Sequence, residues 1–135
     1  MPLRLLVKHR KDGCITAFAY DGRTKVGHIG ACQSLHHLEV QKVHVVESHR
    51  RQKVGTALYT ALAEVGCAMG KPLASAPWQR NRLSEAFWEK QLRLGRAVRV
   101  YKEPPGAQPD EMRESSLTVI QCPLTSLAGR PGRRR

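Results

Sequence analysis

Three basic residues stand together near the middle of the chain, just ahead of an apolar segment with helical spacing. Arg50, Arg51 and Lys53 occupy the first turn of this predicted helix, and no acidic side chain accompanies them there. The N-terminus of a helix already carries partial positive charge and unpaired backbone N–H groups, so acidic residues are preferred at that end. Additional cations are favourable there only if an anion binds. The segment therefore predicts an anion-binding site.

Two common phosphate-binding motifs do not account for this site. The Gly-x4-Gly-Lys-Ser/Thr sequence of nucleoside-triphosphate loops is absent from the segment. The Gly-x-Gly-x-x-Gly fingerprint of dinucleotide-binding folds is absent from it as well. If the anion is a phosphate, it belongs to a different class of ligand.

A strand, a short loop and a helix must position the basic segment. Strands are predicted at 3–8, 14–20 and 25–32, and Asp21-Gly22 predicts the turn between the second and the third. A longer strand spans about 37–46. Further short strands are expected at 71–76, 97–102 and 116–122, with a loop beginning at 103–106 between the last two.

The long strand changes phase along its length. Leu38 and Val40 are apolar at even positions, whereas Val43 and Val45 are apolar at odd ones. Because strand side chains alternate with a period of two, an extra residue is needed near Gln41-Lys42 to keep both pairs on one face. The sequence predicts a β-bulge at this point, just before the basic segment.

Two helices are predicted. The first spans about 50–69 and ends at Gly70, and its buried stripe comprises Val54, Leu58, Ala61, Leu62 and Val65. The second runs from Asn81 or Arg82 to about Leu94 and ends at Gly95, with one side formed by Leu83, Phe87, Gln91 and Leu94.

The hexapeptide Gln52-Lys53-Val54-Gly55-Thr56-Ala57 resembles the pyrophosphate loop of the GNAT superfamily of N-acetyltransferases, Gln/Arg-x-x-Gly-x-Gly/Ala. The segment from Asn81 to Lys90 resembles a second motif of that family, Asn-x-x-Ala/Ser-x-x-Phe/Leu-Tyr-x-Lys. The resemblance covers about residues 37–94, and the flanking strands agree in order. It implies an α/β (α+β) fold: a mixed, mostly antiparallel sheet of about six or seven strands, with a splayed bulged strand and two main helices.

The resemblance also implies a cofactor site. Acetyl-coenzyme A (acetyl-CoA) would be the co-substrate, with its pyrophosphate on the loop and its pantetheine arm in the gap beside the splayed strand. Small residues at 55 and 57 allow the backbone amides to approach the pyrophosphate closely. The positions implied to bind the cofactor are Val45, Val46, Arg50, Arg51, Gln52, Lys53, Val54, Gly55, Thr56, Ala57, Asn81, Ser84 and Trp88.

For such an enzyme, the expected reaction is direct attack of an amine on the thioester. A backbone N–H near Val45 or Val46 would stabilise the carbonyl oxygen. The candidate bases on or beside the strand are Glu39, His44 and Glu47, although ordinary surface roles also account for such residues. A chain of water molecules is a further candidate for the base.

The sequence departs from the family pattern in two places. Trp88 replaces the tyrosine that often protonates the departing thiolate, and an indole N–H is not a general acid, so Ser84, Tyr101 or water must serve instead. Family members commonly place two helices between their first two strands, whereas 9–13 leaves room only for a turn. We therefore expect an open acceptor site, which suits a macromolecule better than an enclosed small molecule.

The composition places these features in one domain, 1–124, followed by a basic tail at 125–135 that we expect to be disordered. The 135 residues carry a formal net charge of +12, which favours an anionic partner. No apolar run approaches a membrane span or a signal peptide, so we expect a soluble cytoplasmic protein without a membrane partner. The four cysteines are singly spaced, which predicts reduced thiols. A zinc site can be drawn from His28, Cys32, His36 and His37, but it lacks two close ligand pairs, and we expect no metal.

Three functions follow from these observations. The first is an acetyl-CoA-dependent N-acetyltransferase whose amine acceptor is a protein, a nucleic acid or a small molecule. The second is a GNAT-like protein that modifies or binds nucleic acid through its basic surface, although no interleaved aromatic residues are evident in the sequence. The third is a catalytically silent coenzyme A-binding interaction module, which the Trp88 replacement favours. The late strands and the 103–115 loop could also support a homodimer.

Overall fold

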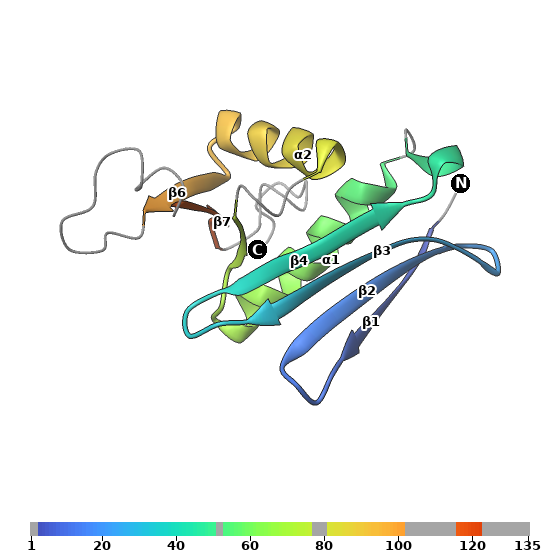
Figure 1. Ribbon diagram of the computed structural model, residues 1–135, viewed down its shortest axis with the longest axis horizontal. Helices are drawn as coiled ribbons and strands as arrows, with labels where there is room; N and C mark the ends of the chain where they lie inside the picture. The colour runs from blue at the N-terminus through green and yellow to red at the C-terminus, as the bar shows by residue number, and fades with distance from the viewer. Residues whose placement is uncertain (1–2, 51–52, 77–80, 102–115, 123–135) are drawn as a thin grey trace, which may run out of the picture.

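A computed structural model of the chain describes residues 3–50, 53–76, 81–101 and 116–122 (Figure 1). A seven-stranded sheet in the order β1-β2-β3-β4-β5-β7-β6 forms its centre, and only the β4–β5 pair is parallel. The strands are β1 (Arg4–His9), β2 (Cys14–Asp21), β3 (Thr24–Gln33), β4 (Leu38–Val45), β5 (Leu73–Ser75), β6 (Ala97–Tyr101) and β7 (Ser116–Ile120). The predicted mixed, mostly antiparallel sheet is confirmed.

Strands β1 to β4 form a meander with tight turns, as the sequence predicts. Between β1 and β2 the backbone N–H of Arg10 donates to the Cys14 carbonyl at 2.8 Å, and Gly13 adopts a φ of 85°. The segment that joins these two strands is therefore a hairpin turn without a helix. Gly22, at a φ of 63°, makes the turn between β2 and β3.

The bulge in β4 lies where the phase change predicts it. Gly30 of β3 pairs with Lys42, and the next residue, Ala31, pairs with Val40. Gln41 is thus the extra residue on β4. Because of this insertion Leu38, Val40, Val43 and Val45 are all buried on the same side of the sheet.

Helix α1 (Val54–Met69) lies along the face of β2, β3 and β4, and in Figure 1 it runs behind β4. Its buried residues are Val54, Gly55, Leu58, Tyr59, Leu62, Ala63 and Gly66. Ala61 and Val65 of the predicted stripe are only half-buried. Gly70 ends the helix in the left-handed conformation, with a φ of 75°, as predicted.

The predicted start of α1 is wrong. A short 3-10 helix, η1 (Glu47–His49), follows β4, and α1 begins only at Val54. Arg50 and Lys53 therefore lie in the loop before the helix and not in its first turn; Arg51 is outside the described residues. No acidic or side-chain cap marks the boundary in the sequence, which explains the error.

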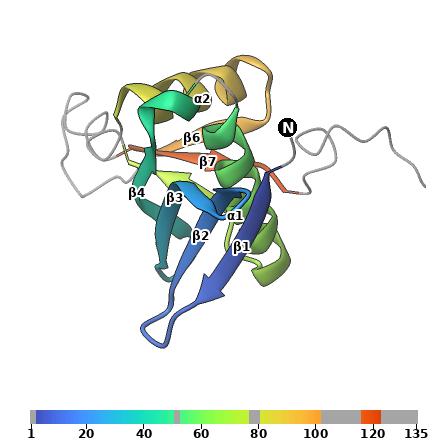
Figure 2. The same ribbon diagram turned by 90° about the vertical axis from the view of Figure 1, so that its right-hand side faces the viewer.

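Helix α2 (Arg82–Arg93) packs beside α1 on the same side of the sheet (Figure 2). Phe87 and Gln91 of its predicted inner side are buried, whereas Leu94 lies after the helix and is 47% exposed. The loop that begins at 103–106, the dimer segment 103–115 and the tail 125–135 lie outside the described residues. Among those described, no helix is long and apolar enough to cross a membrane.

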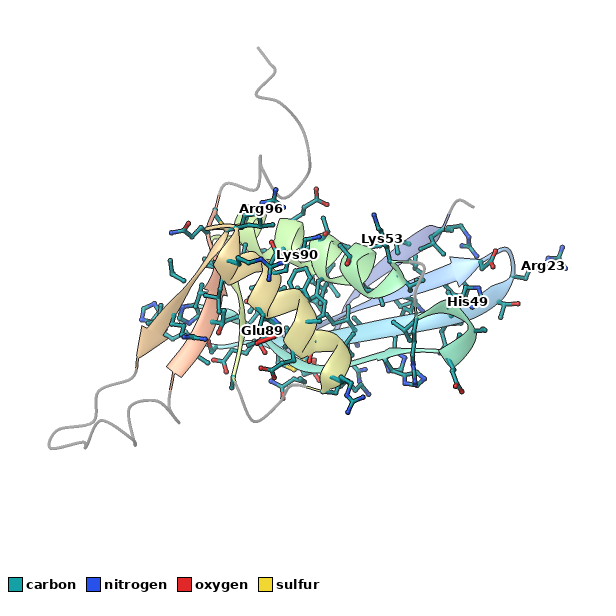
Figure 3. The ribbon with its side chains drawn as sticks, turned by 90° about the horizontal axis from the view of Figure 1, so that it is seen from above. Arg23, His49, Lys53, Glu89, Lys90 and Arg96 are labelled. Carbon is teal, nitrogen blue, oxygen red and sulfur yellow. A yellow bond between two sulfur atoms is a disulfide. The ribbon has the colours of Figure 1, made fainter. Side chains whose placement is uncertain are left out.

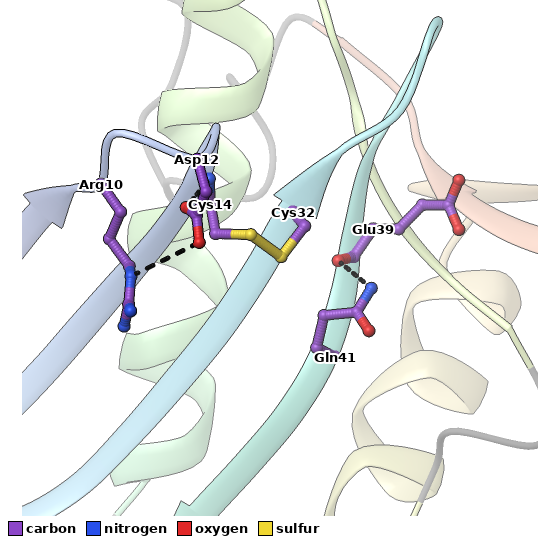
Figure 4. The surroundings of a disulfide bond; sticks show 6 residues. All are labelled: Arg10, Asp12, Cys14, Cys32, Glu39 and Gln41. Atoms are coloured by element: carbon purple, nitrogen blue, oxygen red, sulfur yellow. Dashed lines mark hydrogen bonds and ion pairs between the residues drawn. A yellow bond between two sulfur atoms is a disulfide. The ribbon is translucent and has the colours of Figure 1, made fainter.

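The prediction of four reduced cysteines is wrong, because the structure pairs all of them. Cys14 and Cys32 face each other across β2 and β3 and form one disulfide (Figure 4). The other joins Cys67, near the end of α1, to Cys122, just after β7. Both pairs combine residues far apart in sequence, brought together by strand register and by the packing of α1. Their spacing therefore gave no signal.

Candidate functional site

The N-terminus of α1 is open to an anion. Its first helical hydrogen bond runs from the Ala57 N–H to the Lys53 carbonyl at 3.1 Å, so the N–H groups of Val54, Gly55 and Thr56 precede the helical ladder. No side-chain cap is made by Lys53, and the first turn contains no acidic residue. Backbone donors and the helix dipole thus face outward together at this end.

Lys53 holds the turn that directs these donors. With a φ of 62°, it is the one non-glycine residue in the left-handed region among those the structure describes. A long side chain seldom occupies this region, and residues held there often lie at ligand sites. Its position directly before α1, with an exposed side chain, adds a cation beside the N–H groups of the first turn (Figure 3).

The loop before Lys53 is anchored at two points. His49 Nε2 lies 2.9 Å from Asp21 Oδ2 in the β2–β3 turn, and Ser48 Oγ lies 2.8 Å from His49 Nδ1. Arg50 Nε donates to the Val45 carbonyl at 3.0 Å. These bonds fix the path from β4 to α1, although the intervening Arg51 and Gln52 are outside the described residues.

Beside this loop β4 and β5 diverge and leave a cleft. The two strands pair only at Leu38 with Leu73 and at Glu39 with Ala74. Beyond that point, a space of about 360 Å³ opens next to β4. We call it the β4 cleft, and its walls are Val43, His44, Val45, Arg50, Asn81 and Arg82.

One edge of β4 faces the cleft with its polar backbone groups. The carbonyl of Val43 accepts a bond from Asn81 Nδ2, and that of Val45 accepts one from Arg50 Nε. Both carbonyls therefore point away from β3. In an extended strand the N–H of a residue points to the same side as its carbonyl. Val46 differs, because its N–H donates to the Val26 carbonyl on the β3 side at 2.9 Å. Of the two predicted oxyanion donors, the geometry favours Val45.

Asn81 forms part of the far wall of the cleft, and Ser84 holds it in place. The Ser84 N–H donates to Asn81 Oδ1 at 3.0 Å, and the Asn81 N–H donates to Ser84 Oγ at 2.8 Å, which completes a capping box at the start of α2. Ser84 Oγ also donates to the Asn81 carbonyl at 3.1 Å. Ser84 is buried and holds the helix terminus, which is a structural role and leaves it poorly placed to act as an acid.

A second cavity, of about 250 Å³, lies between the two helices next to the α1 N-terminus. Gln91 is only 3% exposed, and its Oε1 has no hydrogen-bond partner among the described residues. Two basic side chains border this space (Figure 3). We call it the interhelical cavity, and it is lined by Gly55, Thr56, Tyr59, Ala86, Phe87, Lys90, Gln91 and Arg96.

Trp88 does not line either space. It is completely buried and meets Tyr59 and Phe87 edge-on, with ring centroids 5.8 and 5.4 Å away, while Tyr59 and Phe87 stack at 4.2 Å. The cluster packs α1 against α2. Trp88 therefore has the position of a core residue, and its contact with the cofactor stays a prediction.

The three candidate bases are separated in the structure. His44 is exposed and lines the β4 cleft. Glu39 is half-buried where β4 and β5 still pair, and Glu47 is exposed in η1 beyond the end of β4. The side chain of Tyr101, the other predicted acid, is outside the described part of the structure.

The ring of His28 lies beside His44, with 5.8 Å between centroids. Burial lowers the pKa of His28 below its ordinary value of 6.5, and the nearby charges of Lys42, His44 and Lys25 lower it further. His28 is therefore uncharged at neutral pH.

Sequence reasoning missed several residues that border the two spaces: Arg82, Tyr59, Gln91 and Arg96. Arg82 follows the N-cap of α2 and Arg96 follows Gly95, so a cation beside each helix end was the available signal. The hypothetical zinc ligands His28, Cys32, His36 and His37 do not form a group, because within the described ranges no three potential ligands cluster and Cys32 is in a disulfide.

Comparisons with known proteins agree with this geometry. The model of the acetyltransferase (GNAT) family matches residues 2–92. A comparison of the sequence with curated proteins gives no match.

Among solved structures, the chain is similar to the PaiA N-acetyltransferase of Thermoplasma acidophilum in complex with coenzyme A, with a TM-score of 0.55 and 13% identity. The matched region covers 79% of this chain but only 59% of that one. It is also similar to a Klebsiella pneumoniae protein provisionally described as an acyl-CoA N-acyltransferase (TM-score 0.60, 15% identity, 87% and 94% coverage). A third is the ribosomal-protein-S18-alanine N-acetyltransferase of Escherichia coli (TM-score 0.53, 16% identity, 83% and 69% coverage). At these identities the likeness is one of fold.

Proposed function

Because the chain belongs to the acetyltransferase (GNAT) family, we propose that it binds acetyl-CoA at the α1 N-terminus and transfers the acetyl group to an amine. The observation that carries the proposal is the uncapped, acid-free start of α1, which lies between the β4 cleft and the interhelical cavity. A ligand with a central pyrophosphate and two long arms fits this arrangement.

The residues present suit each part of coenzyme A. The first-turn N–H groups of α1 and the Lys53 side chain would hold the pyrophosphate. The pantetheine arm would lie in the β4 cleft, where the N–H of Val43 faces it. Lys90 and Arg96 would take the phosphate at the nucleotide end, where Gln91 Oε1, which has no partner among the described residues, can accept a bond from the adenine amino group.

The chain then supplies positioning and proton transfer. Bound acetyl-CoA provides an activated acetyl carbonyl, and we assign the Val45 N–H to donate to its oxygen. His44, which also lines the cleft, accepts the proton that the amine loses as the new N–C bond forms and the C–S bond breaks. The thiolate is protonated by solvent, because Trp88 is buried and Ser84 serves the helix cap.

The acceptor is proposed by class. The β1–β2 turn leaves the approach to the sheet uncovered by any described helix, so a primary amine on a macromolecule can reach His44. Release of free thiol from acetyl-CoA, with a panel of protein, nucleic-acid and small amines, tests for catalysis. Binding of acetyl-CoA without thiol release for any of them would favour the silent coenzyme A-binding module.

Calorimetry with acetyl-CoA tests the binding site directly. Thr56→Glu places a negative charge on an exposed residue of the first turn of α1, where the pyrophosphate would lie. We expect it to weaken binding about 100-fold, which corresponds to the loss of roughly two charge-assisted hydrogen bonds.

The matched control is Ala68→Glu, which adds the same charge to an exposed position at the other end of the same helix. Binding by this variant should stay within about twofold of the unaltered chain, a difference well under 1 kcal/mol. If Thr56→Glu and Ala68→Glu bind acetyl-CoA with equal affinity, the pyrophosphate does not bind at the α1 N-terminus, and the assignment is overturned.

A further inference from the structure

The face of β1 to β4 that is turned away from α1 is uncovered by any described helix. Buried residues such as Ile15, Ala17 and Ala19 mark the α1 side of β2, so the alternate residues lie on the opposite side. We call this second side the open face. In Figure 1 it lies in front of α1.

A row of rings crosses the open face. Leu6 of β1 pairs with Phe18 of β2, Phe18 pairs with His28 of β3, and His28 pairs with His44 of β4. Directly paired residues on adjacent strands place their side chains next to one another. Three aromatic rings and one leucine therefore form a continuous strip, which ends at His44 in the β4 cleft.

Cations flank this ring row on both sides. On one side, Arg4 pairs with Tyr20 and Tyr20 with Lys25. The guanidinium carbon of Arg4 lies 4.7 Å from the centre of the Tyr20 ring, and Lys25 Nζ lies 5.1 Å from that of Phe18. These pairs put positive charge directly against the rings.

On the other side of the ring row, Lys8 pairs with Thr16 and Lys42 pairs with Gly30. Lys8 Nζ lies 5.9 Å from the centre of the Phe18 ring, and a side chain at Gly30 would touch the stem of Lys42. The four cationic side chains of the flanking rows, Arg4, Lys8, Lys25 and Lys42, are all exposed.

Acidic residues lie outside these three rows. Glu39 pairs with Cys32 and so lies in the row of the Cys14–Cys32 disulfide, Asp21 bonds His49, and Glu47 follows the end of β4. The pKa of His28 reflects the positive charge of the face. Burial lowers this pKa most, and the charges of Lys42, His44 and Lys25 lower it further. An uncovered face with this charge is complementary to a polyanion.

We propose that the open face binds single-stranded nucleic acid, with bases stacked along the ring row and phosphates on the flanking cations. An acidic protein would match the charge but would not need rings between the cations. Sheet faces that combine stacking rings with basic side chains suit unpaired bases, because every base offers a flat face. This binding does not require acetyl-CoA, and it would lead the bound strand to His44.

The first test is fluorescence anisotropy with the full chain and a labelled single-stranded RNA of about 12 nucleotides. The variant Lys8→Ala/Lys25→Ala removes one cation on each side of Phe18. The matched control, Arg93→Ala/Arg99→Ala, removes two exposed cations on α2 and β6 and leaves the same net charge. Any contribution from the basic tail is identical in both variants.

We expect the Lys8/Lys25 variant to bind about tenfold more weakly and its salt slope to fall by about 1.4, the value for two phosphate contacts on a single strand. The control should bind within about twofold of the unaltered chain. Equal loss in the two variants would mean that overall charge and not the open face binds the RNA, which overturns the proposal.

The second test concerns the rings. Phe18→Leu keeps an apolar side chain on a half-buried position, and circular dichroism shows whether it is folded. We expect about tenfold weaker binding of the single strand, with no change for a duplex of the same sequence. The proposal fails if the variant binds the single strand normally and polyglutamate displaces that labelled strand as well as unlabelled RNA does. The face would then be a site for acidic chains.

Discussion

At the scale of single residues, Asn81 determines much of the β4 cleft. Its side chain accepts from the Ser84 N–H and donates to the Val43 carbonyl at 3.2 Å, so one amide group both caps α2 and ties this helix to β4. The N-cap preference was readable from the sequence, because Asn is favoured at that position. The bond to β4 was not, since it joins residues 38 apart in the chain.

His44 is the residue on which the proposed catalysis depends. With an acceptor that supports thiol release, His44→Gln should lower the rate about 100-fold, because glutamine keeps polarity but accepts no proton at neutral pH. Calorimetry should show acetyl-CoA binding retained, since the backbone edge of β4 and not this ring is assigned to the ligand.

Glu39→Gln and Glu47→Gln are the controls for His44. Glu39 lies where β4 and β5 still pair, and Glu47 lies beyond the end of β4. Both variants should therefore retain most of the rate. A large loss in either, with His44→Gln unaffected, would transfer the role of base to that glutamate.

At the scale of elements, the boundary between β4 and α1 was the hardest part of the site to predict. The sequence indicates a strand and a helix on either side, and hydrophobic periodicity places both. It does not indicate that η1 and the left-handed Lys53 intervene, because a positive φ at lysine is maintained by the surrounding structure and not by local preference. The bulge was predictable, since the phase change of apolar residues records it directly.

The packing of α1 on β5 depends on Gly66. A Cβ atom there would lie 2.6 Å from the Lys71 carbonyl oxygen and 3.2 Å from the Leu73 N, both backbone atoms. Gly66→Ala should lower the free energy of unfolding by about 2 kcal/mol, because overpacking of up to about 3 kcal/mol exceeds the gain of about 1 kcal/mol in helix propensity. Urea denaturation measures the change.

Gly30→Ala is the control for close packing at Gly66. At Gly30 a Cβ atom would meet only the flexible Lys42 stem, at 3.8 Å. The free energy of unfolding should then stay within about 0.5 kcal/mol, because no neighbouring atom has to move. A neutral Gly66→Ala would show that α1 and β5 can separate without cost.

At the scale of the whole molecule, contacts between distant segments account for what the sequence did not predict. The rings of the open face stand on three different strands, so they appear scattered along the chain and align only through the registers of β2 with β3 and β3 with β4. The same registers pair Cys14 with Cys32. Local periodicity predicts strands and helices, but it leaves register undetermined where turns and bulges shift it.

The Cys67–Cys122 disulfide links the two parts of the sheet. Strand β4 is joined to β5 by only two residue pairs, and β5 leads to β7 and β6. The disulfide fastens the end of α1, which packs on β2 to β4, to the end of β7. It therefore closes a much longer loop, with a sequence separation of 55 against 18 for Cys14–Cys32.

Removal of the two disulfides should thus have unequal effects. By the loop-entropy relation, Cys67→Ser/Cys122→Ser should cost about 4 kcal/mol of unfolding free energy and Cys14→Ser/Cys32→Ser about 3 kcal/mol. The hairpin ladder also keeps β2 and β3 together without their bridge, which widens the difference. Thermal and urea unfolding with and without dithiothreitol measure both losses. If reductant leaves the unaltered chain as stable as before, the two bridges do not constrain its unfolded state. A larger loss of stability for Cys14→Ser/Cys32→Ser would contradict the assigned role of Cys67–Cys122 in joining the two parts of the sheet.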